Sequence, residues 1–111
     1  MTAKAQIFVG NENIFTGRLS SIRVKIVDSL TSEAIPYASV YVVPAKDTAI
    51  TNFIISDTSG VATLKDVPFG NYVFHIEMMG YMHYAKEKYF REERVDMGTV
   101  KLTLDTVIAE R

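Results

Sequence analysis

The chain has 111 residues, which is the length of one small domain. Its 12 Lys and Arg residues are balanced by 13 Asp and Glu residues, so it lacks the basic excess that is typical of a nucleic-acid binder. The sequence has no Cys, which excludes disulfides, thiol catalysis and thiolate metal sites.

The N-terminal part, residues 1–19, is a lead-in with two short apolar runs at residues 7–9 and 14–16. These runs are compatible with an extra strand or hairpin, and equally with a partly disordered end. In four runs, at residues 22–26, 38–42, 72–76 and 100–104, apolar side chains recur at every second position, which is the pattern of strands with one buried face. The alternation predicts seven strands at residues 20–27, 37–43, 50–56, 61–64, 71–78, 82–90 and 99–104.

Turn-forming residues separate these predicted strands. Residues 57–60 (DTSG) predict a hairpin turn, with Asp57 accepting backbone hydrogen bonds and Gly60 supplying a positive φ. Residues 68–71 predict a second tight turn, and Gly80 and Gly98 are expected to end strands. Residues 84–94 are the best helical candidate, although they also fit a strand followed by a charged turn. Short strands with regular turns predict an all-β sandwich or barrel.

Five short motifs follow one another along the chain. They are residues 26–42, which contain TSEAIPYASVYV, residues 56–60 (SDTSG), 67–72 (VPFGNY), 79–81 (MGY) and 96–102 (DMGTVKL). In order and spacing they resemble the carboxypeptidase regulatory-like domain. Two positions depart from that pattern, since Val24 stands where the family usually has Gly and Ala62 where it usually has an aromatic residue.

The resemblance implies a seven-stranded Greek-key β-sandwich of the transthyretin-like (prealbumin-like) type over residues 20–104. Family members with an IPYASV segment are similar to the N-terminal extension of TonB-dependent outer-membrane receptors. Residues 105–111 resemble the linker toward the plug of such a receptor. The resemblance therefore implies an accessory domain on the periplasmic side of the outer membrane, with membrane association only through a missing downstream region.

Reactive side chains form no recognisable catalytic pattern. His75 and His83 are the two histidines, and no third ligand stands at a suggestive spacing, so we predict no metal site and no cofactor. No Ser lies in a Gly-x-Ser-x-Gly elbow. By parity, Lys25 and Glu77 face water, which argues against a self-made isopeptide bond. We therefore expect no enzymatic activity.

Three functional hypotheses remain. The first is a non-catalytic interaction domain whose partner is another protein or the rest of the same polypeptide, offering edge strands for pairing. The second is a carbohydrate-binding module with a coplanar aromatic pair, either Tyr37 with Tyr41 or Tyr84 with Tyr89. The third is a small transthyretin-type hydrolase, which requires His75, His83 and a basic side chain in one cleft.

The alternative for the four tyrosines is ordinary sheet packing. The methionines at 78, 79 and 82 are likewise expected to fill gaps at the end of the sheets.

Overall fold

All seven predicted strands form. The structure is a computed structural model that describes residues 18–47 and 49–105. The strands are β1 (Leu19–Asp28), β2 (Ser39–Pro44), β3 (Asn52–Ile55), β4 (Val61–Pro68), β5 (Gly70–Glu77), β6 (Tyr84–Phe90) and β7 (Arg94–Leu102). The predicted lead-in runs at 7–9 and 14–16 lie outside the described residues, as does most of the predicted linker 105–111. In the described part of the chain, no helix is long and apolar enough to cross a membrane.

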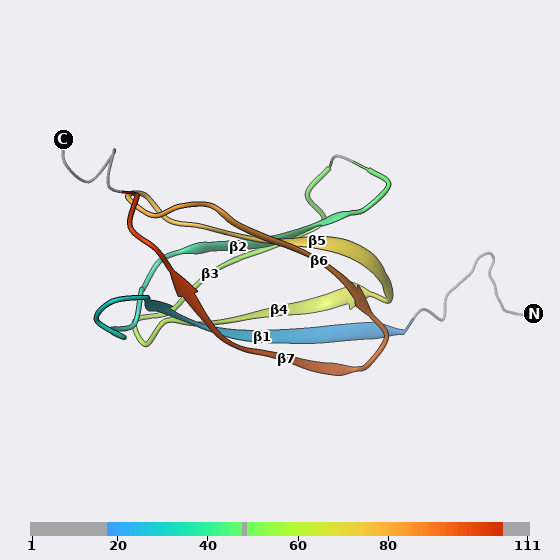
Figure 1. Ribbon diagram of the computed structural model, residues 1–111. Coiled ribbons are helices and arrows are strands. Elements are labelled where there is room, and N and C mark those ends of the chain that lie inside the picture. The colour runs from blue at the N-terminus through green and yellow to red at the C-terminus, as the bar shows by residue number, and fades with distance from the viewer. Residues whose placement is uncertain (1–17, 48, 106–111) are drawn as a thin grey trace, which may run out of the picture.

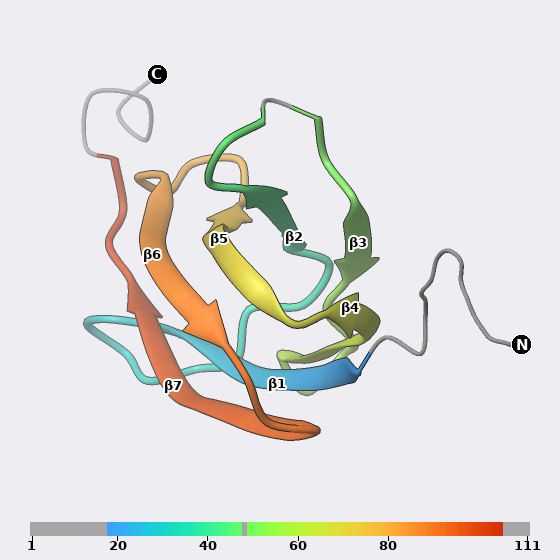
Figure 2. The same ribbon diagram turned by 90° about the vertical axis from the view of Figure 1, so that its right-hand side faces the viewer.

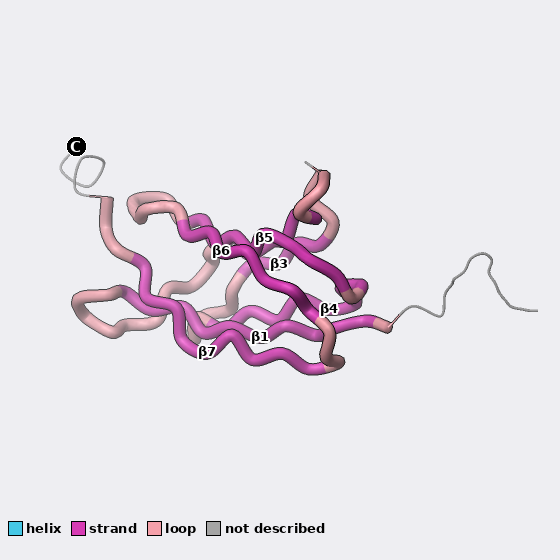
Figure 3. Tube along the Cα trace, turned by 45° about the vertical axis from the view of Figure 1, so that its right-hand side comes forward, coloured by secondary structure: helices cyan, strands magenta, loops and turns pink. Residues whose placement is uncertain are grey.

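The strands make two facing sheets (Figure 1). One sheet has the order β4-β1-β7 and the other the order β3-β2-β5-β6. Hairpins join β2 to β3 and β5 to β6, and the other connections pass from one sheet to the other (Figure 3). This arrangement confirms the predicted seven-stranded β-sandwich. β1 and β7 pair in parallel, which the periodicity did not predict.

The interior is built from the alternating apolar residues that the sequence indicated. Successive side chains on β1, β2 and β5 alternate between a buried and a more exposed position, because a strand turns them to opposite faces. Two aromatic rings, Phe74 and Phe90, are the largest fully buried side chains. They pack among aliphatic residues from both sheets, so the core reaches from β1 across to β6.

The predicted DTSG turn joins β3 to β4. The carboxylate oxygen Oδ1 of Asp57 accepts hydrogen bonds from the backbone N–H of Ser59 and of Val61, both at 2.9 Å. Gly60 has a φ of 78°, and a Cβ there would lie 2.6 Å from the carbonyl oxygen of Ile26. Glycine is required here both for its backbone conformation and because β1 approaches so closely.

A buried carboxylate ties the end of β1 to the turn before β6. Asp28 is 8% exposed and accepts a 2.7 Å hydrogen bond from the hydroxyl of Tyr81. Its other oxygen accepts from the backbone N–H of Leu30 at 2.7 Å and of Thr31 at 3.0 Å. These bonds lower the pKa of Asp28, with the Tyr81 hydroxyl as the largest cause. The Tyr81 hydroxyl of the Gly-Tyr motif therefore adds a polar tie between the two sheets.

The prediction that Gly98 ends a strand is wrong. β7 runs through Gly98, which has a φ of 74°, and begins five residues earlier than predicted, at Arg94. The pairing with β1 shifts register between Arg23 and Lys25, which is the signature of a β-bulge. The carboxylate of Asp96 accepts a 2.8 Å bond from the N–H of Gly98 and so stabilises the bulge. Glycine serves a kink within the strand here, not a turn between strands.

Candidate functional site

A row of rings crosses the outer face of the four-stranded sheet. The register places Phe53 of β3 opposite Tyr41 of β2, and Tyr41 opposite His75 of β5. Directly paired residues share a face, so all three side chains point away from the core. The rings of Tyr41 and His75 are stacked, with centroids 4.7 Å apart and planes 10° from parallel. Phe53 continues the row, with its centroid 6.5 Å from that of Tyr41.

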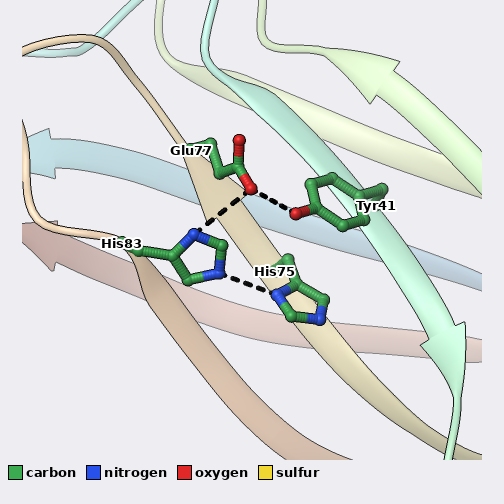
Figure 4. Close-up of polar contacts among 4 residues, drawn as sticks. All are labelled: Tyr41, His75, Glu77 and His83. Carbon is green, nitrogen blue, oxygen red and sulfur yellow. Dashed lines mark hydrogen bonds and ion pairs between the residues drawn. The ribbon is translucent and has the colours of Figure 1, made fainter. Parts of the chain in front are cut away.

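Four polar side chains are linked next to this row (Figure 4). The hydroxyl of Tyr41 donates a short hydrogen bond to Oε2 of Glu77. The same oxygen lies 3.2 Å from Nδ1 of His83. The other ring nitrogen of His83, Nε2, lies 2.8 Å from Nδ1 of His75. When both rings are neutral, His83 donates to Glu77 through Nδ1, and its Nε2 accepts from Nδ1 of His75. We call these residues the Tyr41–His83 chain.

The surroundings shift the pKa of two residues of the Tyr41–His83 chain, Tyr41 and His75. Burial and the hydrogen bond to Glu77 raise the pKa of Tyr41 to about 12, so the phenol keeps its proton at neutral pH. Burial and the neighbouring His83 lower the pKa of His75, and the charge of Glu77 opposes them. His75 is therefore a neutral imidazole at neutral pH, with one nitrogen available as an acceptor or ligand.

Hairpin symmetry brings His83 to this face. Glu77 and His83 are each three residues from Gly80, and the β5–β6 register pairs Ile76 with Tyr84. Continuing that register puts His83 opposite Glu77 and diagonal to His75. Sequence analysis placed His75 and Glu77 on the outer face and missed this meeting. Pairing residues across Gly80 would have found it.

A shallow hollow of about 600 Å³ adjoins the Tyr41–His83 chain. It is lined by residues of the 77–81 turn, by His83 and by Tyr37 and Ser39. Met79, on this turn, is 90% exposed, and Met82 is 57% exposed. The prediction that these two methionines fill core gaps is therefore wrong, whereas Met78 does pack against the core. The turn carries its thioethers outward because Gly80, with a φ of 88°, reverses the chain between them.

The predicted tyrosine pairs do not form. Tyr84 lies opposite buried Ile76 and packs edge-on against Phe74, so it faces the core. Tyr89 lies opposite Asn71 on the outer face and contacts Arg91. An odd separation along one strand puts these two rings on opposite faces.

The predicted pair of Tyr37 with Tyr41 is separated because Tyr37 precedes β2. It lies in a turn with a φ of 66°, outside the row of rings that contains Tyr41. The coplanar partner of Tyr41 is His75 instead, and the two ring faces cover each other.

The hydrolase hypothesis requires His75, His83 and an Arg or Lys in one cleft, and the described part of the structure provides the two histidines only. His75 and His83 do meet, but among the described residues no Arg or Lys lines the hollow or bonds to the Tyr41–His83 chain. No group of three or more His, Cys, Asp or Glu side chains in the described ranges is arranged to hold a metal ion. Among the described residues, the site therefore offers two imidazoles, one carboxylate and one phenol, and no Arg or Lys contacts them.

A second feature is the exposed edge formed by β3. This strand ends its sheet, and Phe53, Ile54 and Ile55 are 54%, 37% and 43% exposed. Ile54 faces inward, opposite Val40, yet remains accessible because the smaller sheet does not cover it fully. Asn52 ties the start of the strand to β4 with a 3.0 Å bond to the carbonyl of Lys65. Both faces of β3 thus present apolar side chains to solvent.

Comparisons with known proteins identify the fold. No protein-family model matches the chain, and no curated protein matches its sequence. Among solved structures it is similar to a pilus 2b backbone protein of group B streptococcus (TM-score 0.63, 14% identity, 83% of this chain and 43% of that one). It is also similar to the major pilin subunit of Bacillus cereus (TM-score 0.58, 13% identity, 76% of this chain and 30% of that one).

A third similar structure is the 5-hydroxyisourate hydrolase of Klebsiella pneumoniae (TM-score 0.60, 12% identity, 75% of this chain and 90% of that one). The fold is therefore a transthyretin-like, pilin-like β-sandwich. The chain spans less than half the length of both pilus proteins it matches.

Proposed function

We propose that this chain is a non-catalytic interaction domain of a larger cell-envelope protein, and that its β3 edge accepts a strand from the partner. The observation that carries the proposal is the exposure of three consecutive apolar residues, Phe53 to Ile55, on a strand with one unpaired edge. Strand addition satisfies the free backbone groups and covers apolar side chains on both faces together.

The partner is a protein segment, either from another chain or from the rest of the same polypeptide. An added strand beside β3 would bring its own alternating side chains next to Phe53 and Ile55 on one face and Ile54 on the other. We expect a segment with apolar residues in alternation and few acidic residues, because Glu77 already lies on the outer face. The motif resemblance supports a position on the periplasmic side of the outer membrane.

Carbohydrate binding has weaker support. Sugars stack on the exposed faces of aromatic rings, and the faces of Tyr41 and His75 are turned toward each other. Phe53 alone offers an accessible ring at the end of the row. An added strand could pack against the Phe53 ring alone, whereas a sugar needs an exposed ring face of an aromatic pair.

A displayed library of random heptapeptides, selected against the purified chain, tests the proposal. We expect enrichment of alternating apolar sequences, and amide chemical shifts of the bound complex should change most at Asn52–Ile55. Ile55→Lys should weaken the selected peptides at least about tenfold, because it puts a charge in the covered face. Lys86→Ala, on the opposite edge, is the matched control and should leave binding unchanged. Selected peptides that map to another surface would overturn the proposal.

A further inference from the structure

We propose that the His75–His83 pair, with the methionine thioethers of the adjoining turn, is a binding site for a copper ion. The site lies on β5 and the β5–β6 turn, apart from the β3 edge, and the inference does not depend on the proposed interaction function. These are the two histidines of the whole sequence, and two of their ring nitrogens face each other at 2.8 Å.

The spacing of the two nitrogens suits a particular coordination geometry. An ion about 2.0 Å from both imidazole nitrogens needs them about 2.8 Å apart in a cis square-planar arrangement and about 3.3 Å apart in a tetrahedral one. The observed 2.8 Å is the length of the hydrogen bond between the two rings, so the nitrogens already lie as close together as a shared ion requires. Square-planar and tetragonal sites of N and O ligands favour Cu²⁺ or Ni²⁺, and Cu²⁺ binds such ligands more tightly.

Glu77 and Tyr41 hold the two imidazole rings in a fixed tautomer and orientation. Oε2 of Glu77 lies against Nδ1 of His83, which keeps the proton on that nitrogen and leaves Nε2 with a lone pair. The ring of Tyr41 stacks on His75 and fixes its plane. Copper takes the place of the one proton that the two rings share. That proton moves to Nε2 of His75, so both imidazoles stay neutral and none is lost to solvent.

Small rotations allow both lone pairs to reach the ion. The side chain of His83 is 45% exposed, and the torsion that turns an imidazole ring is broad. The ion would lie on the outer side of the pair, where water can fill its remaining positions. The absence of a third His, Cys, Asp or Glu ligand among the described residues is therefore compatible with the site.

Exposed methionines indicate copper over other divalent ions. Met79 and His83 line the same hollow, and Met82 lines a smaller one that His83 also borders. A methionine that is 90% exposed, as Met79 is, contributes little to packing. Thioether sulfur is a soft ligand that selects Cu⁺. His83 borders both hollows, so a thioether from Met79 or Met82 would be the soft ligand nearest to the pair.

Titration of the purified chain with Cu²⁺ tests the imidazole pair, read by calorimetry and by electron paramagnetic resonance. We expect one Cu²⁺ per chain with hyperfine coupling from two imidazole nitrogens. His83→Asn should lower the affinity at least about tenfold and remove one coupling, and His75→Asn should act alike. His83 is exposed, so its variant keeps the fold even if the His75 variant does not. Identical titrations of the parent chain and His83→Asn would overturn the proposal.

A pair of glutamate variants tests the supporting role of Glu77. Glu77→Gln should weaken Cu²⁺ binding about tenfold, because the amide holds the His83 tautomer less firmly. Glu87→Gln is the matched control, since Glu87 also lies on the outer face and bonds to Asn71 at 2.7 Å. Equal losses in both variants would show a general charge effect and would remove Glu77 from the site.

Silver ion, a redox-inert stand-in for Cu⁺, tests the thioethers. The double variant Met79→Leu, Met82→Leu should lose most Ag⁺ binding and keep its Cu²⁺ affinity. Met97→Leu, a methionine that packs against the core from β7, should change neither. Unchanged Ag⁺ binding in the double variant would overturn the assignment of the methionines.

Discussion

β3 and β6 are the two edges of the four-stranded sheet (Figure 2). Their side chains protect these edges to very different degrees. β6 carries Lys86, Glu87 and Lys88 in succession, and exposed charges discourage pairing with another strand. β3 carries Phe53, Ile54 and Ile55 at the equivalent place. One edge is thus closed to strand addition by its side chains and the other is open. This contrast supports our proposal that a partner strand would add at β3.

The two edges also differ in how they are anchored. β6 ends in Phe90, which is fully buried in the core, whereas no side chain of β3 is buried. β6 therefore depends on the core for its position, and β3 depends on its hydrogen bonds to β2, on its turn and on the bond from Asn52 to β4. Mutations should separate stability, to which β6 contributes through Phe90, from binding, which we propose for β3.

The largest expected effect is that of Phe90→Ala. Removing a fully buried ring leaves a cavity and should lower the free energy of unfolding by about 3–5 kcal/mol. Urea denaturation followed by circular dichroism measures it. A loss below about 1 kcal/mol would show that β6 is not anchored by this ring.

Gly60→Ala should come next, because the turn that ends β3 needs both a positive φ and a close approach to β1. We expect a loss of about 2–3 kcal/mol in thermal or urea unfolding. Gly98→Ala is the control, since a Cβ there meets nothing within 4 Å and only the backbone strain, about 1 kcal/mol, is added. Equal losses in the two variants would contradict the close approach at Gly60.

Acid should weaken the anchor that precedes β6. The pKa of Asp28 is lowered in the folded state, so its contribution to stability is present above the ordinary carboxyl pKa and is lost as the pH falls through the folded value. Asp28→Asn should be less stable than the parent chain at pH 7, and the difference should shrink below about pH 4. Urea midpoints measured across this range check it. Parallel curves would remove Asp28 from the anchor.

The smallest expected effect on stability is that of Phe53→Ala. The ring is 54% exposed, so its removal should cost less than about 1 kcal/mol. The same change should abolish binding of the selected strand peptides, which fluorescence anisotropy measures. A stability loss as large as that of Phe90→Ala would mean that β3 is part of the core.

Much of the fold follows from local patterns in the sequence. Alternation located β1, β2 and β5, because each has one buried face, and the Asp57–Gly60 turn has the chemistry its residues suggest. Gly98 was misjudged because a bulge and a turn both use a glycine with positive φ, and pairing with β1 decides between them. The exposure of β3 was also out of reach, since it depends on how far the smaller sheet extends.

The candidate site shows the same limit. Alternation along β5 placed His75 and Glu77 on the outer face, but it cannot predict which residues of neighbouring strands come together. The meeting with His83 depends on the register of the β5–β6 hairpin, and the stacking of Tyr41 on His75 depends on that of β2 with β5. The tyrosine pairs were chosen by residue type, without regard to which face each ring would occupy.

The parallel pairing of β1 with β7 has a mechanical consequence. β1 begins at Leu19 and β7 ends at Leu102, at opposite ends of the same ladder. A pull that separates these two points loads all the hydrogen bonds of the ladder in shear at the same moment, so they must rupture together. Within a longer polypeptide under tension, such a unit would transmit force without extending.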